Sequence, residues 1–297
     1  MGLFNNYTKP GPGVSKDAPK KKGIFLYLEL FWRKFSKLIS LNILYFICSL
    51  PMTILYFVIT LLVMPNLFNN ILDISQIGQE NLVIMEMILS LFLSLFFTIT
   101  LGSGPASAAM AYVMREFSRE NHVWLFSTFF EKMKENFKQE IVVAVVDLVF
   151  LFVASFGLIF YFNQYLLTGS MLWFFLLVLM MIFSFIIISM HYYIHQLIVT
   201  FENKLKDIYK NAFLFAMSTV LKNILLTAFI IAILYFVCNF LHPVVVLIIS
   251  LFLLVSFLRF PVEFFSQDTI KKLIKYETEE TVTDDEIVEP DLHRSEK

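Results

Sequence analysis

The chain has 297 residues, of which 58% are hydrophobic, 17% are aromatic and only 16% are charged, with a formal net charge of −1. A soluble globular domain usually carries about 25% charged residues. The apolar residues lie in runs of about 20, the length that a helix needs to cross about 30 Å of hydrocarbon. The composition therefore excludes a soluble globular protein and predicts an all-α membrane protein.

Charge is distributed unevenly along the chain. The first 24 residues contain three prolines and predict an extended basic arm in the cytoplasm, suited to anionic lipids. Residues 277–297 hold nine acidic and two basic residues, which predicts a disordered acidic tail. Residues 25–276, between these two ends, form the predicted membrane domain. The lysines assigned to the basic arm are Lys16, Lys20, Lys21 and Lys22.

Six apolar runs are long enough to cross a membrane. They lie at residues 38–64, 82–112, 141–163, 171–198, 224–241 and 243–265. The connections after the first, third and fifth runs contain no Lys or Arg, so all 23 basic residues lie in the other connections, the chain ends and the inner end of the last run. The positive-inside rule then predicts six spans in the cell membrane, with the N and C termini in the cytoplasm.

A segment with apolar residues on one helical face precedes each outward-going span. These segments are residues 25–37, 123–138 and 205–222. Such patterns are typical of amphipathic helices that lie at the membrane surface. The sequence therefore predicts three copies of one unit, a cytoplasmic interfacial helix followed by a transmembrane hairpin.

Five ionisable residues lie at similar predicted depth in the cytoplasmic leaflet. They are Asp147, His191, His195, Arg259 and Glu263. An ionised group at mid-helix costs about 2.5–3.5 kcal/mol on insertion scales, so it normally faces a partner or a cavity. Because its own span holds nothing to neutralise Asp147, we expect this carboxylate to approach His191. Instead of a functional role, the two histidines can have a packing or hydrogen-bonding role. Arg259 and Glu263 can instead extend their charged groups to the membrane interface.

The second run contains small residues around a proline. They are Gly102, Ser103, Gly104, Pro105, Ala106 and Ala108. Small residues four apart let helices approach closely, and Pro105 predicts a kink. We interpret the stretch as a helix-packing patch, or as the surface on which a partner's helix docks.

The sequence shows no motif for nucleotide or metal chemistry. No glycine is followed by Lys, and neither a Gly-x-Ser-x-Gly nor a His-Glu-x-x-His pattern occurs. Cys48 and Cys238 lie in different apolar runs and read as small buried side chains. We therefore predict no catalytic or metal site, no cofactor, no bound nucleotide and no nucleic-acid partner.

Several short segments carry a family resemblance. Residues 7–14 (YTKPGPGV), 20–22 (KKK), 29–35 (ELFWRKF), 104–106 (GPA) and 112–117 (YVMREF) resemble the YesL-like family of bacterial membrane proteins, a family built on a domain of unknown function, number 624. Its members are typically encoded beside binding-protein-dependent sugar importers and glycoside-degrading enzymes. The resemblance implies a role in oligosaccharide uptake and brings no catalytic residue with it.

Three functions follow from these observations as hypotheses. The first is a non-enzymatic accessory or assembly subunit of a carbohydrate ABC importer, with the permease subunits as partners. The second is an autonomous small-molecule transporter or channel, because three hairpins with polar groups in the inner leaflet can line a pathway. The third is a membrane enzyme that acts through Asp147, His191 and His195.

Overall fold

The structure is a computed structural model that describes residues 23–71, 79–201 and 203–285, and within these ranges it is helical without any strand. The lysines of the predicted basic arm lie outside the described residues. The helices are α1 (Ile24–Ile71), α2 (Gln79–Thr100), α3 (Pro105–Ser118), α4 (Leu125–Glu135), α5 (Phe137–Thr168), α6 (Met171–Ile198), α7 (Leu205–Ser218), α8 (Val220–Phe240), α9 (Pro243–Ile249), the π-helical turn η2 (Ser250–Leu254) and α10 (Val255–Asp285).

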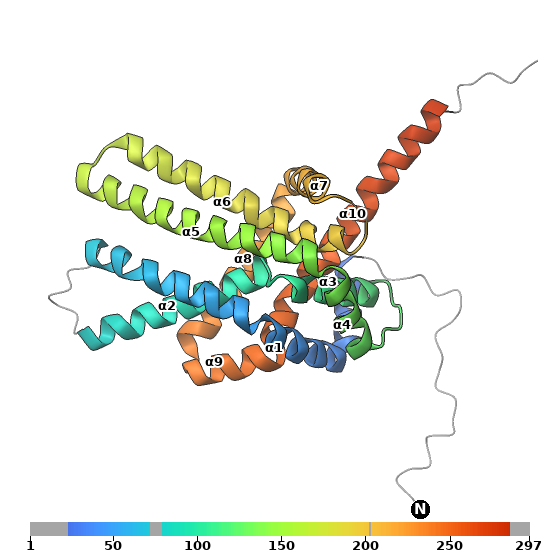
Figure 1. Ribbon diagram of the computed structural model, residues 1–297, viewed down its shortest axis with the longest axis horizontal. Coiled ribbons are helices and arrows are strands. Elements are labelled where there is room, and N and C mark those ends of the chain that lie inside the picture. The colour runs from blue at the N-terminus through green and yellow to red at the C-terminus, as the bar shows by residue number, and fades with distance from the viewer. Residues whose placement is uncertain (1–22, 72–78, 202, 286–297) are drawn as a thin grey trace, which may run out of the picture.

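Six helical stretches of the described chain are long and apolar enough to cross a membrane, as the sequence predicted. They are Ile24–Val63, Val83–Thr100, Phe137–Thr168, Met171–Ile198, Val220–Phe240 and Pro243–Lys272. α1, α2, α5 and α6 run roughly side by side along the longest axis of the molecule (Figure 1). The fold is therefore that of an all-helical, multi-pass membrane protein.

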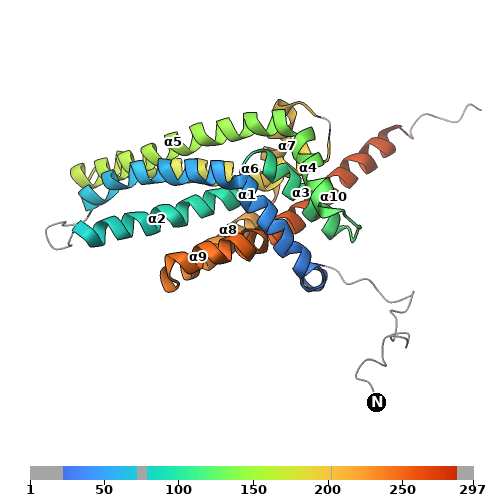
Figure 2. The ribbon, with the colours of Figure 1, turned by 60° about the horizontal axis from the view of Figure 1, so that its bottom comes forward.

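Some predicted boundaries differ from the structure. Residues 25–37 do not form a helix of their own, because α1 continues without interruption from Ile24 to Ile71. Pro51 lies inside this helix, where it removes one backbone hydrogen bond, and α1 is visibly bent (Figure 2). At the other end of the chain, α10 extends to Asp285 and so includes residues 277–285 of the predicted acidic tail.

The first four spans pack in two pairs, and the last two pack on the first pair. α1 packs on α2, and α5 packs on α6 through a tight turn at Gly169, a left-handed residue whose N–H donates to the carbonyl of Tyr165 at 2.8 Å. α8 packs mainly on α2, while η2 packs on α1, so the last two spans contact the first pair more than each other. The short helix α3 packs on α1, α4, α5, α6 and α10, with Ala108, Ala109 and Met110 fully buried.

One end of the bundle carries most of the charged residues and is called the basic end below. It contains the start of α1, the end of α3, all of α4 and the middle of α10 (Figure 1), and the chain enters α7 nearby, where Gln139 at the start of α5 donates to the carbonyl of Asn203 at 3.2 Å. Representative cations from these elements are Lys34, Arg119, Lys134, Lys206 and Lys271.

Candidate functional site

The second predicted span is interrupted in its middle. We expected one helix over 82–112 with a kink at Pro105, but α2 ends at Thr100 and α3 begins at Pro105, with residues 101–104 outside any helix. The reason is local: Gly102 and Gly104 have φ angles of +100° and +64°, which glycine adopts freely and other residues rarely do. Pro105 then starts α3 at a position where its missing N–H costs nothing.

Backbone groups freed by the break are bonded by side chains from two other helices. The carbonyl of Leu101 accepts a hydrogen bond from Nε2 of His195 on α6 at 2.7 Å, and the carbonyl of Gly102 accepts one from the hydroxyl of Tyr56 on α1 at 3.0 Å. Non-helical backbone at membrane depth is tolerated only where it is buried in protein or lines a water-filled cavity. Here it is buried, because Leu101, His195 and Tyr56 are each at most 1% exposed.

A third helix reaches the same break through an ion pair. Arg259 on α10 contacts Oε1 of Glu263 at 2.9 Å and donates to the hydroxyls of Ser107 at 3.3 Å and Tyr45 at 3.4 Å. Ser107 also accepts from the backbone N–H of Ser103 at 2.6 Å. Arg259 and Glu263 are 2% and 1% exposed, so the alternative in which they extend to the interface is wrong. The ion pair and the hydrogen bonds inside the bundle stabilise both charged groups away from the interface.

The buried pair of Asp147 and His191 confirms the expected approach of these two residues. Oδ1 of Asp147 on α5 lies 2.6 Å from Nε2 of His191 on α6. The other ring nitrogen, Nδ1, lies 2.8 Å from the carbonyl oxygen of Ile187. Both nitrogens of His191 therefore face groups that accept hydrogen bonds.

Glu140 forms a second pair that the sequence analysis missed. Its carboxylate oxygens lie 3.0 and 3.1 Å from Nδ1 of His195, and Glu140 is fully buried. We had placed the start of the third span at residue 141, which left Glu140 in the connection. The available signal was its spacing from Asp147, since seven residues are two helical turns and put both carboxylates on one face of α5.

Each histidine ring lies between a carbonyl oxygen and a carboxyl group. A carbonyl oxygen only accepts, so Nε2 of His195 and Nδ1 of His191 are the donors toward Leu101 and Ile187. Nδ1 of His195 is hydrogen-bonded to Glu140, and Nε2 of His191 makes an ion-pair contact with Asp147 at 2.6 Å. Placing each buried carboxyl group beside an imidazole avoids the large cost of an unpaired buried charge.

The five ionisable residues predicted as a cluster thus lie around one feature, the break between α2 and α3. The ring centroids of His191 and His195 are 6.1 Å apart, which places the two pairs next to each other along α5 and α6. Among the described residues no group of three or more His, Cys, Asp and Glu side chains is arranged to hold a metal ion. The site offers buried acidic and basic groups that are joined by hydrogen bonds and ion pairs.

The small-residue patch packs inside the chain. Ala106 and Ala108 are at most 1% exposed, and a Cβ on Gly104 would lie 3.3 Å from the Cβ of Ala144 on α5. A Cβ on Gly102 would lie 2.5 Å from Nε2 of His195. The patch is therefore a packing surface between α3 and its neighbours, and its small side chains face α5 and α6 rather than the outside of the bundle.

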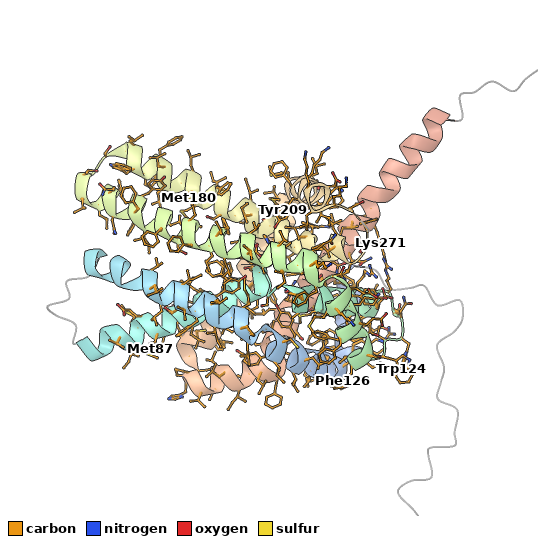
Figure 3. All side chains as sticks on the ribbon, viewed as in Figure 1. Met87, Trp124, Phe126, Met180, Tyr209 and Lys271 are labelled. Carbon is orange, nitrogen blue, oxygen red and sulfur yellow. The ribbon has the colours of Figure 1, made fainter. Side chains whose placement is uncertain are left out.

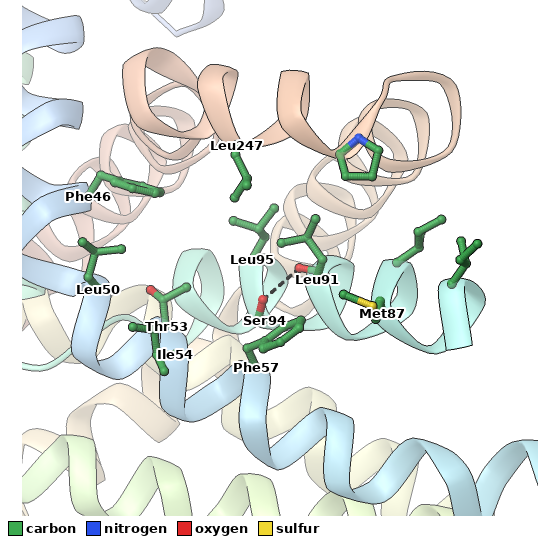
Figure 4. A pocket seen from close by; sticks show the side chains of 13 residues that line it. Phe46, Leu50, Thr53, Ile54, Phe57, Met87, Leu91, Ser94, Leu95 and Leu247 are labelled. Carbon is green, nitrogen blue, oxygen red and sulfur yellow. Dashed lines mark hydrogen bonds between the residues drawn. The ribbon is translucent and has the colours of Figure 1, made fainter. Parts of the chain in front are cut away.

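An apolar groove lies on the outside of the bundle, among α1, α2 and α9 (Figure 4). Its cavity volume is about 500 Å³. The hydroxyls in its wall are bonded internally, since Ser94 donates to the carbonyl of Leu91 at 2.9 Å and Thr53 to that of Ser49 at 3.1 Å. We call it the lateral groove; it is lined by Leu50, Ile54, Met87, Leu91, Leu95 and Leu247, among others.

Exposed aromatic residues gather at α4, at the basic end (Figure 3). Trp124 and Phe126 are 76% and 63% exposed, whereas Phe129 is fully buried and anchors the helix on α3. The hydrogen bond from Lys132 to Glu135, 2.6 Å long, raises the pKa of the Lys132 side chain. α4 thus presents large apolar rings beside charged lysines, the composition of a membrane-surface or protein-contact helix.

The fold and the buried site define a multi-pass helical membrane protein with a broken span. The family model described as "Protein of unknown function, DUF624" matches residues 82–164, which include the break, α4, Glu140 and Asp147. This match supports assigning the chain to that family and confirms the resemblance found in the sequence. No curated protein and no solved structure matches the chain.

Proposed function

We propose that the chain is a non-catalytic accessory or assembly subunit that associates with the permease subunits of a carbohydrate ABC importer in the cell membrane. The resemblance to the YesL-like family supplies the link to oligosaccharide uptake. The observation that carries the proposal is the lateral groove, which we assign to a transmembrane helix of a permease. Its wall is apolar and its few hydroxyls are internally bonded, so an apolar helix face can fill it without leaving a polar group unpaired.

In this proposal both termini and the basic end lie in the cytoplasm. The segregation of Lys and Arg supports that orientation through the positive-inside rule. The same proposal includes three repeats of an interfacial helix followed by a transmembrane hairpin. α4 and α7 are two of the interfacial helices, and the start of α1 takes this place in the first repeat. The exposed rings of Trp124 and Phe126 on the α4 side then face lipid headgroups or the cytoplasmic parts of the importer.

Co-purification tests the partner assignment. We would extract the full-length chain from its native membrane in mild detergent and identify bound proteins by mass spectrometry. Met87→Trp fills the lateral groove, whereas Val149→Trp adds the same ring at an exposed position on α5. We expect sugar permeases with the wild type and Val149→Trp, and their loss with Met87→Trp. Retention in both variants would remove the groove from the proposal, and a wild-type chain that never brings down a permease would refute the accessory function.

A second candidate, an autonomous transporter or channel, is favoured by one observation. Discontinuous helices with freed backbone groups near the membrane midplane form the binding sites of many secondary transporters. The break at residues 101–104, with ionisable partners from α5, α6 and α10, has that character. In the conformation described, the break is sealed, because the five predicted ionisable residues are each at most 2% exposed. Substrate-dependent flux in liposomes that contain the purified chain alone would favour this candidate over the accessory subunit.

A further inference from the structure

A cavity of about 460 Å³ opens at the basic end, between the ends of α3 and α6 and the middle of α10. Its volume lies in the range of small-molecule sites, about 300–1,000 Å³. Arg119 and Lys271 contribute two positive charges to its lining, and none of its lining residues is acidic. Lys271 lies at the same end of the molecule as Trp124 (Figure 3).

The carboxylates near these two cations make their hydrogen bonds with other residues. Glu116 contacts Nε of Arg115 at 3.1 Å and accepts from Asn121 at 2.6 Å, while its distance to Nη1 of Arg119 is 3.7 Å, longer than a hydrogen bond. Asp268, which is near Lys271, pairs with Lys272 at 2.8 Å instead. Within the described part of the chain, Arg119 and Lys271 therefore both face the cavity without a hydrogen-bonded carboxylate.

The side-chain amide of Gln267 holds the Arg119 guanidinium in place and uses only some of its N–H donors. With the Gln267 amide oriented to satisfy its neighbours, its oxygen accepts from Nε and Nη2 of Arg119 at 3.3 and 3.1 Å. Its nitrogen donates to Oε1 of Gln196 at 3.1 Å. A guanidinium has five N–H donors. The second N–H of Nη2 and both of Nη1 make no hydrogen bond, although Nη1 forms an ion pair with Glu116 at 3.7 Å. The side chain is 35% exposed, which gives a ligand access to them.

The wall of the cavity also leads to the broken helix. Gln196 donates to Oε2 of Glu263 at 2.6 Å, and Glu263 pairs with Arg259, which reaches Ser107 at the break. A hydrogen-bonded chain thus connects Arg119 at the cavity with the centre of the bundle.

We propose that this cavity binds a phosphate group, with Arg119 and Lys271 as its charged ligands. A guanidinium fork and a lysine ammonium are both common phosphate ligands, and two cations from different helices match the charge of a phosphomonoester.

The competing role for cations at this place is to neutralise the carbonyl ends of α3 and α6. Arg115 already fills that role at α6, where Nη1 donates to the carbonyl of Val199 at 2.9 Å and to Thr200 at 2.8 Å. Lys271 has no such contact within the described residues.

The phosphate has two possible sources, a soluble organic phosphate or an anionic phospholipid headgroup. The purified full-length chain would be placed in nanodiscs of phosphatidylcholine and titrated with sn-glycerol 3-phosphate at constant ionic strength, with thermal unfolding as the readout. A parallel series would replace part of the phosphatidylcholine with phosphatidylglycerol. A ligand that binds only the folded state raises the unfolding temperature. A rise with glycerol phosphate identifies the soluble source, and a rise only with phosphatidylglycerol identifies the lipid.

Four variants decide whether the cavity is responsible. Arg119→Gln and Lys271→Gln should weaken binding about tenfold or more, as expected for the loss of a charged hydrogen bond. Lys271→Arg keeps the charge and should retain binding, which separates ligand loss from misfolding. Lys134→Gln removes an exposed charge from α4 at the same end of the bundle and should bind as the wild type does. The proposal is overturned if neither phosphate source raises the unfolding temperature, or if Lys134→Gln weakens binding as much as Lys271→Gln.

Discussion

Glu140 on α5 holds one nitrogen of the His195 ring at 3.0 Å while the other nitrogen bonds the carbonyl of Leu101 at 2.7 Å. One imidazole thus joins a carboxylate on a neighbouring span to the backbone of a broken helix. The carboxylate orients the ring, and the ring satisfies a carbonyl that no helix hydrogen bond reaches. Through this contact, α5 and α6 stabilise the non-helical backbone at residues 101–104.

Removing either partner should destabilise the chain strongly. Glu140→Gln and His195→Gln each break a buried pair, a loss that typically costs about 3–5 kcal/mol. The double variant should lose less than the sum, by a coupling energy of about 1–3 kcal/mol, because two amides can bond each other. The free energy of unfolding would be measured in mixed micelles for the wild type, the two single variants and the double variant. The exposed pair Arg33–Glu120, 2.6 Å apart, is the control and should show coupling below about 1 kcal/mol. Additive losses for Glu140 and His195 would contradict the proposed role of the pair.

The glycine at the break should be more sensitive to substitution than another glycine with positive φ. Gly102→Ala places a Cβ 2.5 Å from His195 Nε2 and Ser107 Oγ in a strained backbone conformation, whereas Gly169→Ala has a φ of +64° with open space around it. The strain alone costs about 1–3 kcal/mol. Gly102→Ala should therefore lower the unfolding temperature clearly further than Gly169→Ala. Equal shifts would mean that His195 is not packed against the break.

Hydropathy and charge were sufficient to predict the number of spans, and depth was sufficient to predict the Asp147–His191 contact. The break was missed because glycine permits a positive φ without requiring it, so the sequence around Pro105 also fits a kinked continuous helix. Glu140 was missed because a single carboxylate at the edge of an apolar run looks like an interfacial residue. The contacts of Tyr45 and Arg259 depend on how α1 and α10 meet, and pairing between distant helices leaves no periodic signal in one sequence.

The Asp147 side chain should tolerate loss of charge better than loss of its polar group. Asp147→Asn can donate its amide N–H to Nε2 of His191, while Asp147→Leu leaves that nitrogen buried without a partner. An unsatisfied buried polar group costs about 1–3 kcal/mol. We expect Asp147→Asn to retain most of the wild-type stability and Asp147→Leu to lose it, by yield and thermal unfolding in detergent. Equal stability of the two variants would show that the contact contributes nothing.

Impermeant thiol labelling in intact cells would test the proposed orientation. With Cys48 and Cys238 replaced, Ser170→Cys lies in the turn between α5 and α6, and Lys134→Cys lies on α4 at the basic end. The positive-inside rule predicts labelling of Ser170→Cys from outside and protection of Lys134→Cys until the cells are opened. The reverse pattern would invert the topology and place the proposed phosphate cavity outside the cell.

The basic arm offers a test of assembly that leaves the membrane domain intact. Residues 1–22 precede α1 and hold Lys16, Lys20, Lys21 and Lys22, whose charge suits anionic lipids as well as a protein partner. If the arm contacts the importer, a chain that lacks residues 1–22 should still insert and unfold at the wild-type temperature, yet lose co-purification with sugar permeases, and growth on the cognate glycan should fall. A variant with the four lysines changed to glutamine separates charge from length. If both shortened and neutralised chains keep their permeases and support normal growth, the arm binds lipid alone, and the partner contact must lie in the lateral groove or on α4.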